Sequence, residues 1–340
     1  MRKLVNSTPT RSLRTERNGA VPRLPYPNGW FAVAFCDELP VGRVLTRPFM
    51  GESIVLYRTS SGLLRAIRPY CPHLGAHLGY GGRVDGEDIV CPFHNFAFSP
   101  TGACVRTGYG TPPPPNARLA ALEMREVDGV ILVWRHAQDC PPDWEIPPTM
   151  PEGFCPKHIV RTLVTHPQEI CENAVDTGHF AAVHKMVANT YQVGFTGPVI
   201  EINMEASLIA GSRSGFLDHF GSNSIFQLHG LGWIFSRFNI PKLGLHVKLW
   251  MLPTPIDPLH LEVRIAGNVE RFLGHELSRP VIRLFSKVVV SLSARDFAQD
   301  APIWNNKTYV ELPKLAKGDG PIMEFRRWAK QFYSTDVPDD

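Results

Sequence analysis

Short apolar runs separated by Gly, Pro and charged turns fill the first 135 residues of the chain. They include the segments at 30–35 (WFAVAF), 53–59 (SIVLYRT), 63–69 (LLRAIRP) and 129–135 (GVILVWR). Runs of this length, rich in β-branched and aromatic residues and bounded by turn residues, are typical of strands in a small antiparallel sheet. We therefore expect the N-terminal part of the chain to be an all-β domain.

Longer apolar segments follow residue 154. The segment at 167–184 (PQEICENAVDTGHFAAVH) has no Gly or Pro between its first residue and Gly178 and is predicted to form a helix, as is the segment at 279–304. Strands are predicted at 224–228, 232–240, 245–252 and 260–269. An antiparallel sheet with helices grouped around it makes this part an α+β domain.

Five prolines fall within residues 136–154. Proline removes a backbone donor and favours extended or turn geometry, so this segment is predicted to be a linker. The expected organisation is a basic flexible tail at 1–22, the all-β domain at 23–138, a proline-rich linker at 139–153 and the α+β domain at 154–340.

The composition is that of a globular protein, and it limits the partners the chain can have. With 340 residues, 44% hydrophobic and 20% charged, the chain can bury a large core and has room for about two domains. Its formal charge of +3 is too small for its length to indicate nucleic-acid binding. The sequence has no run of about 18 uncharged apolar residues and no signal-like N-terminus, so we expect a soluble, cytoplasmic protein.

The basic N-terminal tail has two interpretations. One is a solvated, disordered segment, and the other is a weak peripheral contact with anionic lipid. Its basic residues are Arg2, Lys3, Arg11, Arg14 and Arg17.

Cysteine usage argues against a secreted disulfide framework, because the chain has seven cysteines and two of them lie in a motif with histidines. The remaining five are expected to be packed, reduced thiols. They are Cys36, Cys104, Cys140, Cys155 and Cys171.

Two short motifs place a cysteine beside a histidine. One residue separates Cys71 from His73, and two separate Cys91 from His94. Thiolate and imidazole together could hold a tetrahedral zinc ion, although zinc modules usually pair like ligands within each loop. The mixed pattern suits a Rieske [2Fe-2S] cluster, in which Cys71 and Cys91 would bind one iron and His73 and His94 the other.

The segment 71–94 resembles the Rieske family. Rieske proteins of respiratory complexes carry an extra cysteine in each loop, and here those positions hold Ala76 and Phe93. The missing disulfide points to the ferredoxin and oxygenase branches. Many oxygenases have Gly-Trp after the last ligand, where this chain has Asn95 and Phe96. That difference alters the surroundings of the cluster and leaves its ligands unchanged.

A second pair of histidines lies in the predicted helix at 167–184. His179 and His184 are five residues apart, which on a regular helix is about 140°, so they could share an ion only where the helix ends or bends. Alone, two such histidines are more often ordinary polar contacts. The wider segment resembles the Asn-x-x-Asp-x-x-His-x-x-x-x-His signature of Rieske non-heme iron oxygenases, which Asn173, Asp176, His179 and His184 match. The resemblance makes Asn173 and Asp176 candidate catalytic residues.

Mononuclear iron that activates O2 commonly uses two His and one carboxylate on one face. Asp296 and Asp300 are four residues apart in the predicted helix at 279–304, so both could lie on one side of it. The family resemblance favours Asp300, in the segment QDAPIW, as the ligand. Asp296 would then be a surface or capping carboxylate.

Asp176 precedes His179 by three residues and can accept a hydrogen bond from the second nitrogen of that ligand. In the family that the chain resembles, the matching Asp also bridges this His to a Rieske His of a neighbouring subunit. The resemblance therefore implies a homotrimer in which electrons cross a subunit boundary, with His94 of the neighbouring subunit as the partner.

Residues 25–335 as a whole resemble this family. The segments YCPHLGAHLGYGGRV, QDAPIWNNKTYVELPKL and FRRWAKQFY are most similar to the branch that contains steroid 9α-hydroxylase oxygenases and cholesterol 7-desaturases. The resemblance implies a terminal oxygenase that uses a Rieske cluster, mononuclear Fe(II) and O2 to hydroxylate, desaturate or oxidatively demethylate an apolar substrate. We expect a sterol or steroid. The apolar strands between 224 and 251 could line its pocket or could equally be core.

The sequence has no G-x-G-x-x-G fingerprint after a strand, so NAD(P)H is expected to act through a separate reductase, with or without a ferredoxin. Three alternatives stay open. The chain could be an oxygenase for a non-steroid aromatic or secondary-metabolite substrate, a Rieske electron carrier without oxygenase activity, or a zinc-stabilised binding module.

Overall fold

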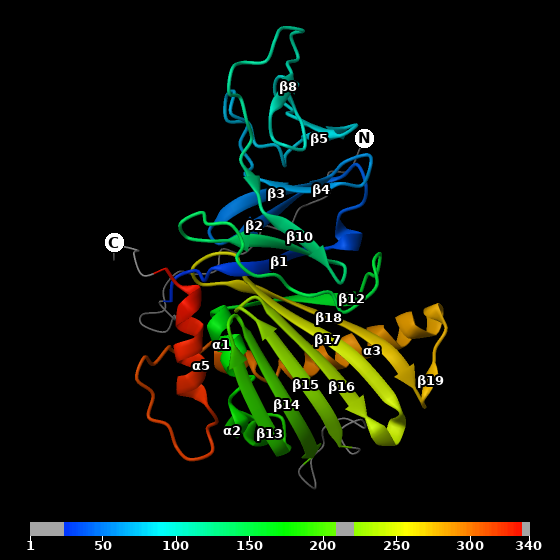
Figure 1. Cartoon of the computed structure of the whole chain (residues 1–340), viewed down its shortest axis with the longest axis vertical. Coiled ribbons are helices and arrows are strands. Elements are labelled where there is room, and N and C mark those ends of the chain that lie inside the picture. The colour runs from blue at the N-terminus through cyan, green and yellow to red at the C-terminus, as the bar shows by residue number, and fades with distance from the viewer. Residues whose placement is uncertain (1–23, 209–220, 335–340) are drawn as a thin grey trace, which may run out of the picture.

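The chain forms two β-rich domains that follow one another along the long axis of the molecule (Figure 1). The computed structural model describes residues 24–208 and 221–334, so the predicted basic tail at 1–22 lies outside the described residues. Antiparallel sheets with few helices confirm the expected class, an all-β domain followed by an α+β domain. None of the helices in the described part of the chain combines the length and apolarity that crossing a bilayer requires.

Three small antiparallel sheets make up the N-terminal domain. The first contains β1 (Gly29–Phe35), β11 (Val130–Arg135) and β10 (Met124–Val127). The second contains β2 (Val44–Phe49), β3 (Glu52–Arg58), β4 (Leu64–Ile67) and β9 (Ala121–Leu122). The third, at the far end of the molecule in Figure 1, contains β5 (Arg83–Asp85), β6 (Asp88–Val90), β7 (Ala97–Phe98) and β8 (Cys104–Arg106).

One antiparallel sheet of eight strands dominates the C-terminal domain, in the order β12-β18-β17-β16-β15-β14-β13 with β19 paired to β18. Its strands are β12 (Lys157–Leu163), β13 (Met186–Thr196), β14 (Val199–Leu208), β15 (Ser222–His229), β16 (Trp233–Ile240), β17 (Leu245–Pro255), β18 (Leu261–Phe272) and β19 (His275–Glu276). The four predicted strands fall on β15 to β18. The sequence pattern does not predict β12, β13, β14 and β19.

The helices gather around the large sheet, and α3 runs behind it in Figure 1, packed against β18 and β12. The α-helices are α1 (Pro167–Glu172), α2 (Thr177–Ala182), α3 (Arg279–Phe297), α4 (Ala301–Trp304) and α5 (Ile322–Ala329). Short 3-10 helices are η1 (Cys36–Glu38), η3 (Pro241–Leu243) and η4 (Lys330–Phe332).

Both predicted long helices are interrupted, so their predicted continuity is wrong. The segment 167–184 divides into α1 and α2, because the carboxylate of Asp176 caps α2 by accepting from the backbone N–H of Gly178 (3.1 Å) and His179 (3.3 Å). The segment 279–304 divides into α3 and α4, and Asp300 is the N-cap residue of α4. The two breaks therefore fall at residues that the sequence predicts to be functional.

The two domains share an apolar core. Successive side chains of β1 point to opposite faces, so Trp30 packs toward Trp250 of β17 while its neighbours face the N-terminal core. The buried guanidinium of Arg264 donates to the carbonyls of Ala32 (3.1 Å) and Val33 (2.9 Å). These contacts join β18 to β1 and fix the relative position of the two domains.

The segment at 136–156 contains neither helix nor strand, and it includes the predicted linker at 139–153. It is packed against both domains. The ring of Trp144 contacts the rings of Trp134 and Phe332, with centroids 5.6 and 6.4 Å apart. The linker therefore follows the domain interface and does not act as a free spacer.

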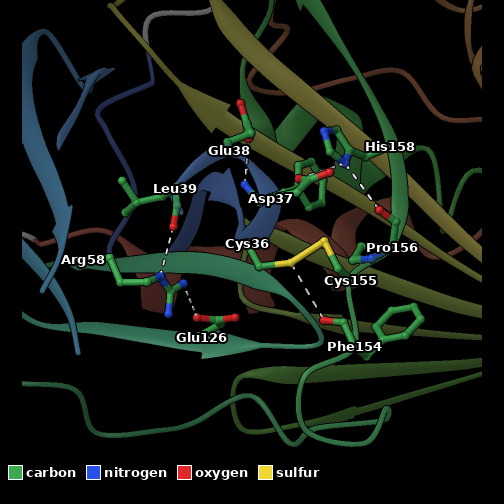
Figure 2. Close-up of a disulfide and its surroundings, with 11 residues drawn as sticks. Cys36, Asp37, Glu38, Leu39, Arg58, Glu126, Phe154, Cys155, Pro156 and His158 are labelled. Carbon is green, nitrogen blue, oxygen red and sulfur yellow. Dashed lines mark hydrogen bonds and ion pairs between the residues drawn. A yellow bond between two sulfur atoms is a disulfide. The ribbon is translucent and has the colours of Figure 1, made fainter. Parts of the chain in front are cut away.

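Cys36 and Cys155 form a disulfide, so the prediction that both are reduced thiols is wrong (Figure 2). Their Cα atoms are 6.2 Å apart, although 119 residues separate them in the chain. Domain packing brings them together, because η1 follows β1 and the chain emerging from the linker passes beside it. Of the cysteines outside the motifs, Cys171 is buried and Cys104 half-buried, as expected for packed thiols, whereas Cys140 is exposed.

Candidate metal centres

Two loops at the far end of the N-terminal domain carry the paired cysteines and histidines. Cys71 and Cys91 are buried, whereas His73 and His94 are half-buried, with ring centroids 4.8 Å apart. Burial raises the pKa of the Cys71 thiol to about 11, and the neighbouring Cys91 acts in the same direction. Two thiols on the inside and two imidazoles toward the surface fit the ligand set of a Rieske cluster, whose irons would supply the positive charge that buried thiolates need.

The two loops repeat one backbone conformation. Each cysteine donates its backbone N–H to the carbonyl five residues later, at 2.9 Å from Cys71 and 2.8 Å from Cys91. The fourth residue after each cysteine has a positive φ, +73° at Gly75 and +54° at Asn95. Asn tolerates this left-handed conformation better than other side chains do, so Asn95 takes the conformation that the usual Gly would have.

Phe96, which stands where many oxygenases have Trp, is buried beside the histidines. Its ring stacks on the imidazole of His73, with centroids 4.4 Å apart and the planes within 9° of each other. Large apolar side chains around the two loops are more than half exposed. They are Tyr70, Leu74, Tyr80, Phe93 and Tyr109. An exposed apolar rim of this kind indicates a surface that contacts another protein.

A second cluster of donors lies in the C-terminal domain. His179 belongs to α2, His184 follows that helix, and Asp300 begins α4. One ligand atom from each of the three lies within 4.8 Å of the others. Two histidines five residues apart can meet here because the helix ends between them. The last residue of α2 is Ala182, and Lys185, directly after His184, has φ +58°.

The second cluster has the charge and the geometry for a divalent cation. Burial alone would lower the pKa of His184, but the adjacent carboxylates of Asp296 and Asp300 raise this pKa to about 10. Burial lowers the pKa of His179. Two imidazoles and one buried carboxylate on one side are the donors that non-heme Fe(II) takes in enzymes that activate O2, with other positions left open.

The two candidate carboxylates lie on opposite sides of His184. Asp300 Oδ2 is 3.2 Å from Nε2 of His184, and Asp296 Oδ1 is 3.3 Å from Nδ1. The nitrogen that faces Asp300 is therefore Nε2. This arrangement places Asp300, and not Asp296, among the three gathered donors.

Asp176 lies beside His179, and the oxygen nearest to the imidazole is its backbone carbonyl and not its carboxylate. Nδ1 of His179 is 2.5 Å from the backbone carbonyl of Asp176 and 4.0 Å from its carboxylate. The carboxylate instead accepts from backbone N–H groups at the start of α2. Asn173 is the half-buried C-cap residue of α1.

A buried ion pair that the sequence pattern does not predict lies next to the segment that carries the candidate metal donors. Arg326 of α5 donates to both carboxylate oxygens of Glu172, from Nε at 2.7 Å and from Nη2 at 3.0 Å. Glu172 ends α1, directly before Asn173, so the pair ties the ligand-bearing segment to the C-terminal helix. No local pattern could have predicted it, because the partners are 154 residues apart.

A loop pair with Rieske donors in an all-β domain, followed by a two-His, one-carboxylate site in an α+β domain, defines the class of Rieske non-heme iron oxygenases. Family models agree with this class. The model of the Rieske [2Fe-2S] domain matches residues 29–118, and that of the 3-ketosteroid 9α-hydroxylase C-terminal domain matches residues 133–333. The chain belongs to the 3-ketosteroid 9α-hydroxylase family of Rieske oxygenases.

Known relatives support this membership. The chain is 33% identical to cholesterol 7-desaturase nvd of Bombyx mori, across 96% of this chain and 73% of that protein. It is 28% identical to the probable 3-ketosteroid-9-alpha-monooxygenase oxygenase component of Rhodococcus rhodochrous, across 92% and 81%.

Solved structures share the fold. Apo dicamba monooxygenase has a TM-score of 0.62 at 17% identity, covering 90% of this chain and 96% of that one. NdmA of Pseudomonas putida CBB5 has a TM-score of 0.66 at 18% identity, covering 89% of each chain. The protein is accordingly an oxidoreductase, the oxygenase component of a Rieske system, with a [2Fe-2S] cluster and a mononuclear iron as cofactors and a reductase as electron donor.

Proposed function

We propose that the protein is the terminal oxygenase of a system that oxidises a sterol or steroid. In this proposal Cys71, His73, Cys91 and His94 hold the Rieske cluster, and the mononuclear iron binds at His179, His184 and Asp300. The observation that carries the proposal is the gathering of the last three donors, from two segments far apart in the sequence, within 4.8 Å. An electron carrier would have no use for such a site. The relatives named as a cholesterol desaturase and a ketosteroid monooxygenase support the substrate class.

The surroundings of the iron site suit an apolar substrate. Alternation along β15, β16 and β17 places Phe226, Phe238, Leu249 and Met251 on one face of the sheet, and all four are only half-buried. The side chain of Phe226 belongs to the same apolar cluster as Phe180, the residue after His179. The opposite face of these strands packs on the N-terminal domain. A half-covered apolar face beside the metal ligands is where we place the substrate.

Within this assignment each part of the chain has a distinct task. When bound, the cluster supplies single electrons and the mononuclear iron activates O2. The half-covered sheet face holds the apolar substrate and excludes water from the reacting centre. The carbonyl of Asp176 orients His179, and the ion pair between Glu172 and Arg326 holds α1 in place behind it.

We further propose that the enzyme is a homotrimer in which electrons pass between subunits. Within one chain the cluster loops and α2 lie toward opposite ends of the long axis (Figure 1). The exposed apolar rim around the cluster loops of one subunit would contact the neighbouring subunit near Asp176 of that neighbour. A reductase could bind to the same rim. Asp176 would then connect His94 of one subunit to His179 of the next.

The remaining organisation follows the sequence. We propose domain limits of 23–138 and 154–340 around a linker at 139–153, supported by the absence of helix and strand between residues 136 and 156. A cytoplasmic location, an intermediate ferredoxin and a weak contact of the basic tail with anionic lipid stay predictions.

Substitutions in the cluster loops test the first ligand set. We expect Cys71→Ser and His94→Ala each to abolish the Rieske spectrum, because in each variant one of the two irons would lose one of its two protein ligands. Visible absorption of the purified variants is the measurement, and His77→Ala is the matched control. His77 lies in the same loop, but its Nδ1 accepts from the backbone N–H of Gly79 (3.0 Å). An unchanged spectrum in Cys71→Ser or His94→Ala would show that the ligands are misassigned.

Turnover with defined substrates tests the proposed function. The purified protein, a reductase and NAD(P)H would be incubated with cholesterol, with a 3-ketosteroid and with a small aromatic compound, and the products identified by mass spectrometry. We expect a product only from the sterol or steroid, with an added oxygen atom for hydroxylation or two fewer hydrogens for desaturation. Oxidation of the aromatic compound alone would replace the proposal with its alternative, an oxygenase for a non-steroid substrate.

A further inference from the structure

We infer that Asp296 is a positioning residue for the mononuclear iron, holding the Nδ1 side of His184 so that Nε2 faces the metal. The inference rests on the proposed iron site. Asp296 Oδ1 lies 3.3 Å from Nδ1, while Nε2 lies 3.2 Å from Asp300 on the other side of the ring. Nδ1 is buried and makes no well-aligned hydrogen bond to any described residue, so the Asp296 carboxylate is the acceptor within its reach.

Both histidines have an oxygen next to Nδ1. Nδ1 of His179 contacts an oxygen, the backbone carbonyl of Asp176, at 2.5 Å. Nδ1 of His184 contacts the oxygen of Asp296. In both rings an oxygen that can accept lies next to the outer nitrogen, and such an acceptor favours the tautomer that leaves the Nε2 lone pair for the metal. Metal-binding histidines usually have such an outer acceptor, and its loss weakens metal binding.

The position of Asp296 in the fold supports a role at the metal and not in folding. It lies in the last turn of α3, where a negative charge opposes the helix dipole. Its side chain is 62% exposed and so contributes little to the core. Gln299 donates from Nε2 to Asp296 Oδ1 at 2.7 Å and thereby holds the carboxylate against His184. The contact with the imidazole of His184 explains why a carboxylate occupies this exposed position at the unfavourable end of α3.

The break between α3 and α4 gives the two aspartates their different roles. Asp296 is still on α3, whereas Asp300 is the N-cap residue of α4 and is buried. The turn between them wraps around the imidazole of His184, so that one carboxylate meets each ring nitrogen. A continuous helix would have kept both carboxylates on one face, as the sequence predicted.

The test is the affinity of the mononuclear site for Fe(II), measured anaerobically by competition with a chelator on protein that keeps its cluster. We expect Asp296→Ala to weaken this affinity by roughly 10- to 100-fold. Asp296→Asn should lie closer to the wild type, because the amide oxygen can still accept from Nδ1. Glu324→Ala, which removes an exposed carboxylate from α5, should leave the affinity unchanged.

A second measurement separates positioning from a structural role. The near-UV circular dichroism and the Rieske spectrum of the protein without mononuclear iron should not change in Asp296→Ala, because this exposed side chain contributes little to the core. Wild-type iron affinity in Asp296→Ala, or a loss of affinity that accompanies a changed circular dichroism spectrum, would overturn the inference. An asparagine variant as weak as the alanine variant would also overturn it. If His184→Ala keeps its iron, the iron site itself is misplaced, which is a different failure.

Discussion

Asp300→Ala is expected to remove the mononuclear iron and all oxygenation while leaving the visible spectrum of the cluster unchanged. The reason is geometric. Asp300 is the buried carboxylate that meets Nε2 of His184 at 3.2 Å, and no charge compensates for its loss on that side of the ring. Two neutral imidazoles alone bind Fe(II) much more weakly than the full set of two histidines and a carboxylate. The cluster loops are in the other domain and are not disturbed.

Iron content after gel filtration and single-turnover product formation are the measurements for Asp300→Ala. Iron per chain should fall by about one atom, and product should be undetectable. Asp296→Ala is the comparison, because it changes the neighbouring carboxylate and should reduce affinity without destroying the site. If Asp296→Ala loses the iron completely and Asp300→Ala retains it, the ligand has been assigned to the wrong aspartate.

Asp176→Asn is expected to stop electron transfer without emptying either metal site. Asparagine is as good an N-cap residue as aspartate, so the cap on α2 should survive. The contact to Nδ1 of His179 comes from the backbone carbonyl, which the substitution leaves in place. What is lost is the negative charge, which we propose links the neighbour's His94 to His179. Asp176→Ala, by contrast, should also destabilise the protein by about 0.5–2 kcal/mol through loss of the cap.

Reduction of the cluster first, followed by addition of O2 and substrate, measures this step in Asp176→Asn. We expect both iron centres to stay bound, the reduced cluster to persist and product formation to fall by orders of magnitude. Reoxidation of the cluster coupled to product at the wild-type rate would exclude the bridging role. An enzyme that is active as a strict monomer would exclude transfer between subunits altogether.

The sequence predicts those parts of the sites that depend on spacing within one segment. Cys71 and His73 lie in one loop and Cys91 and His94 in another, and each loop closes through its own backbone hydrogen bond. His179 and His184 needed only the end of a short helix to come together. These are local features, so spacing and residue type determine them.

The parts that sequence analysis missed depend on contacts between distant segments. The disulfide joins Cys36 to Cys155 across 119 residues, and no spacing rule pairs two cysteines in different domains. The ion pair between Glu172 and Arg326 spans 154 residues.

The division of the predicted helix at 279–304 has the same kind of cause. Helical propensity alone would continue the helix past residue 300. In the structure α3 ends at Phe297, and the turn that follows lets Asp300 reach His184. Tertiary contacts thus override local preference at the metal site.

Counting metals shows whether one chain holds both a Rieske cluster and a separate mononuclear iron. Iron, zinc and acid-labile sulfide would be measured on the same protein sample together with its visible spectrum. We expect about three iron atoms and about two sulfide ions per chain, with a Rieske spectrum and no zinc. About two iron atoms and two sulfides per chain would mean that the protein holds only the cluster and is an electron carrier. Zinc without sulfide would contradict both iron centres.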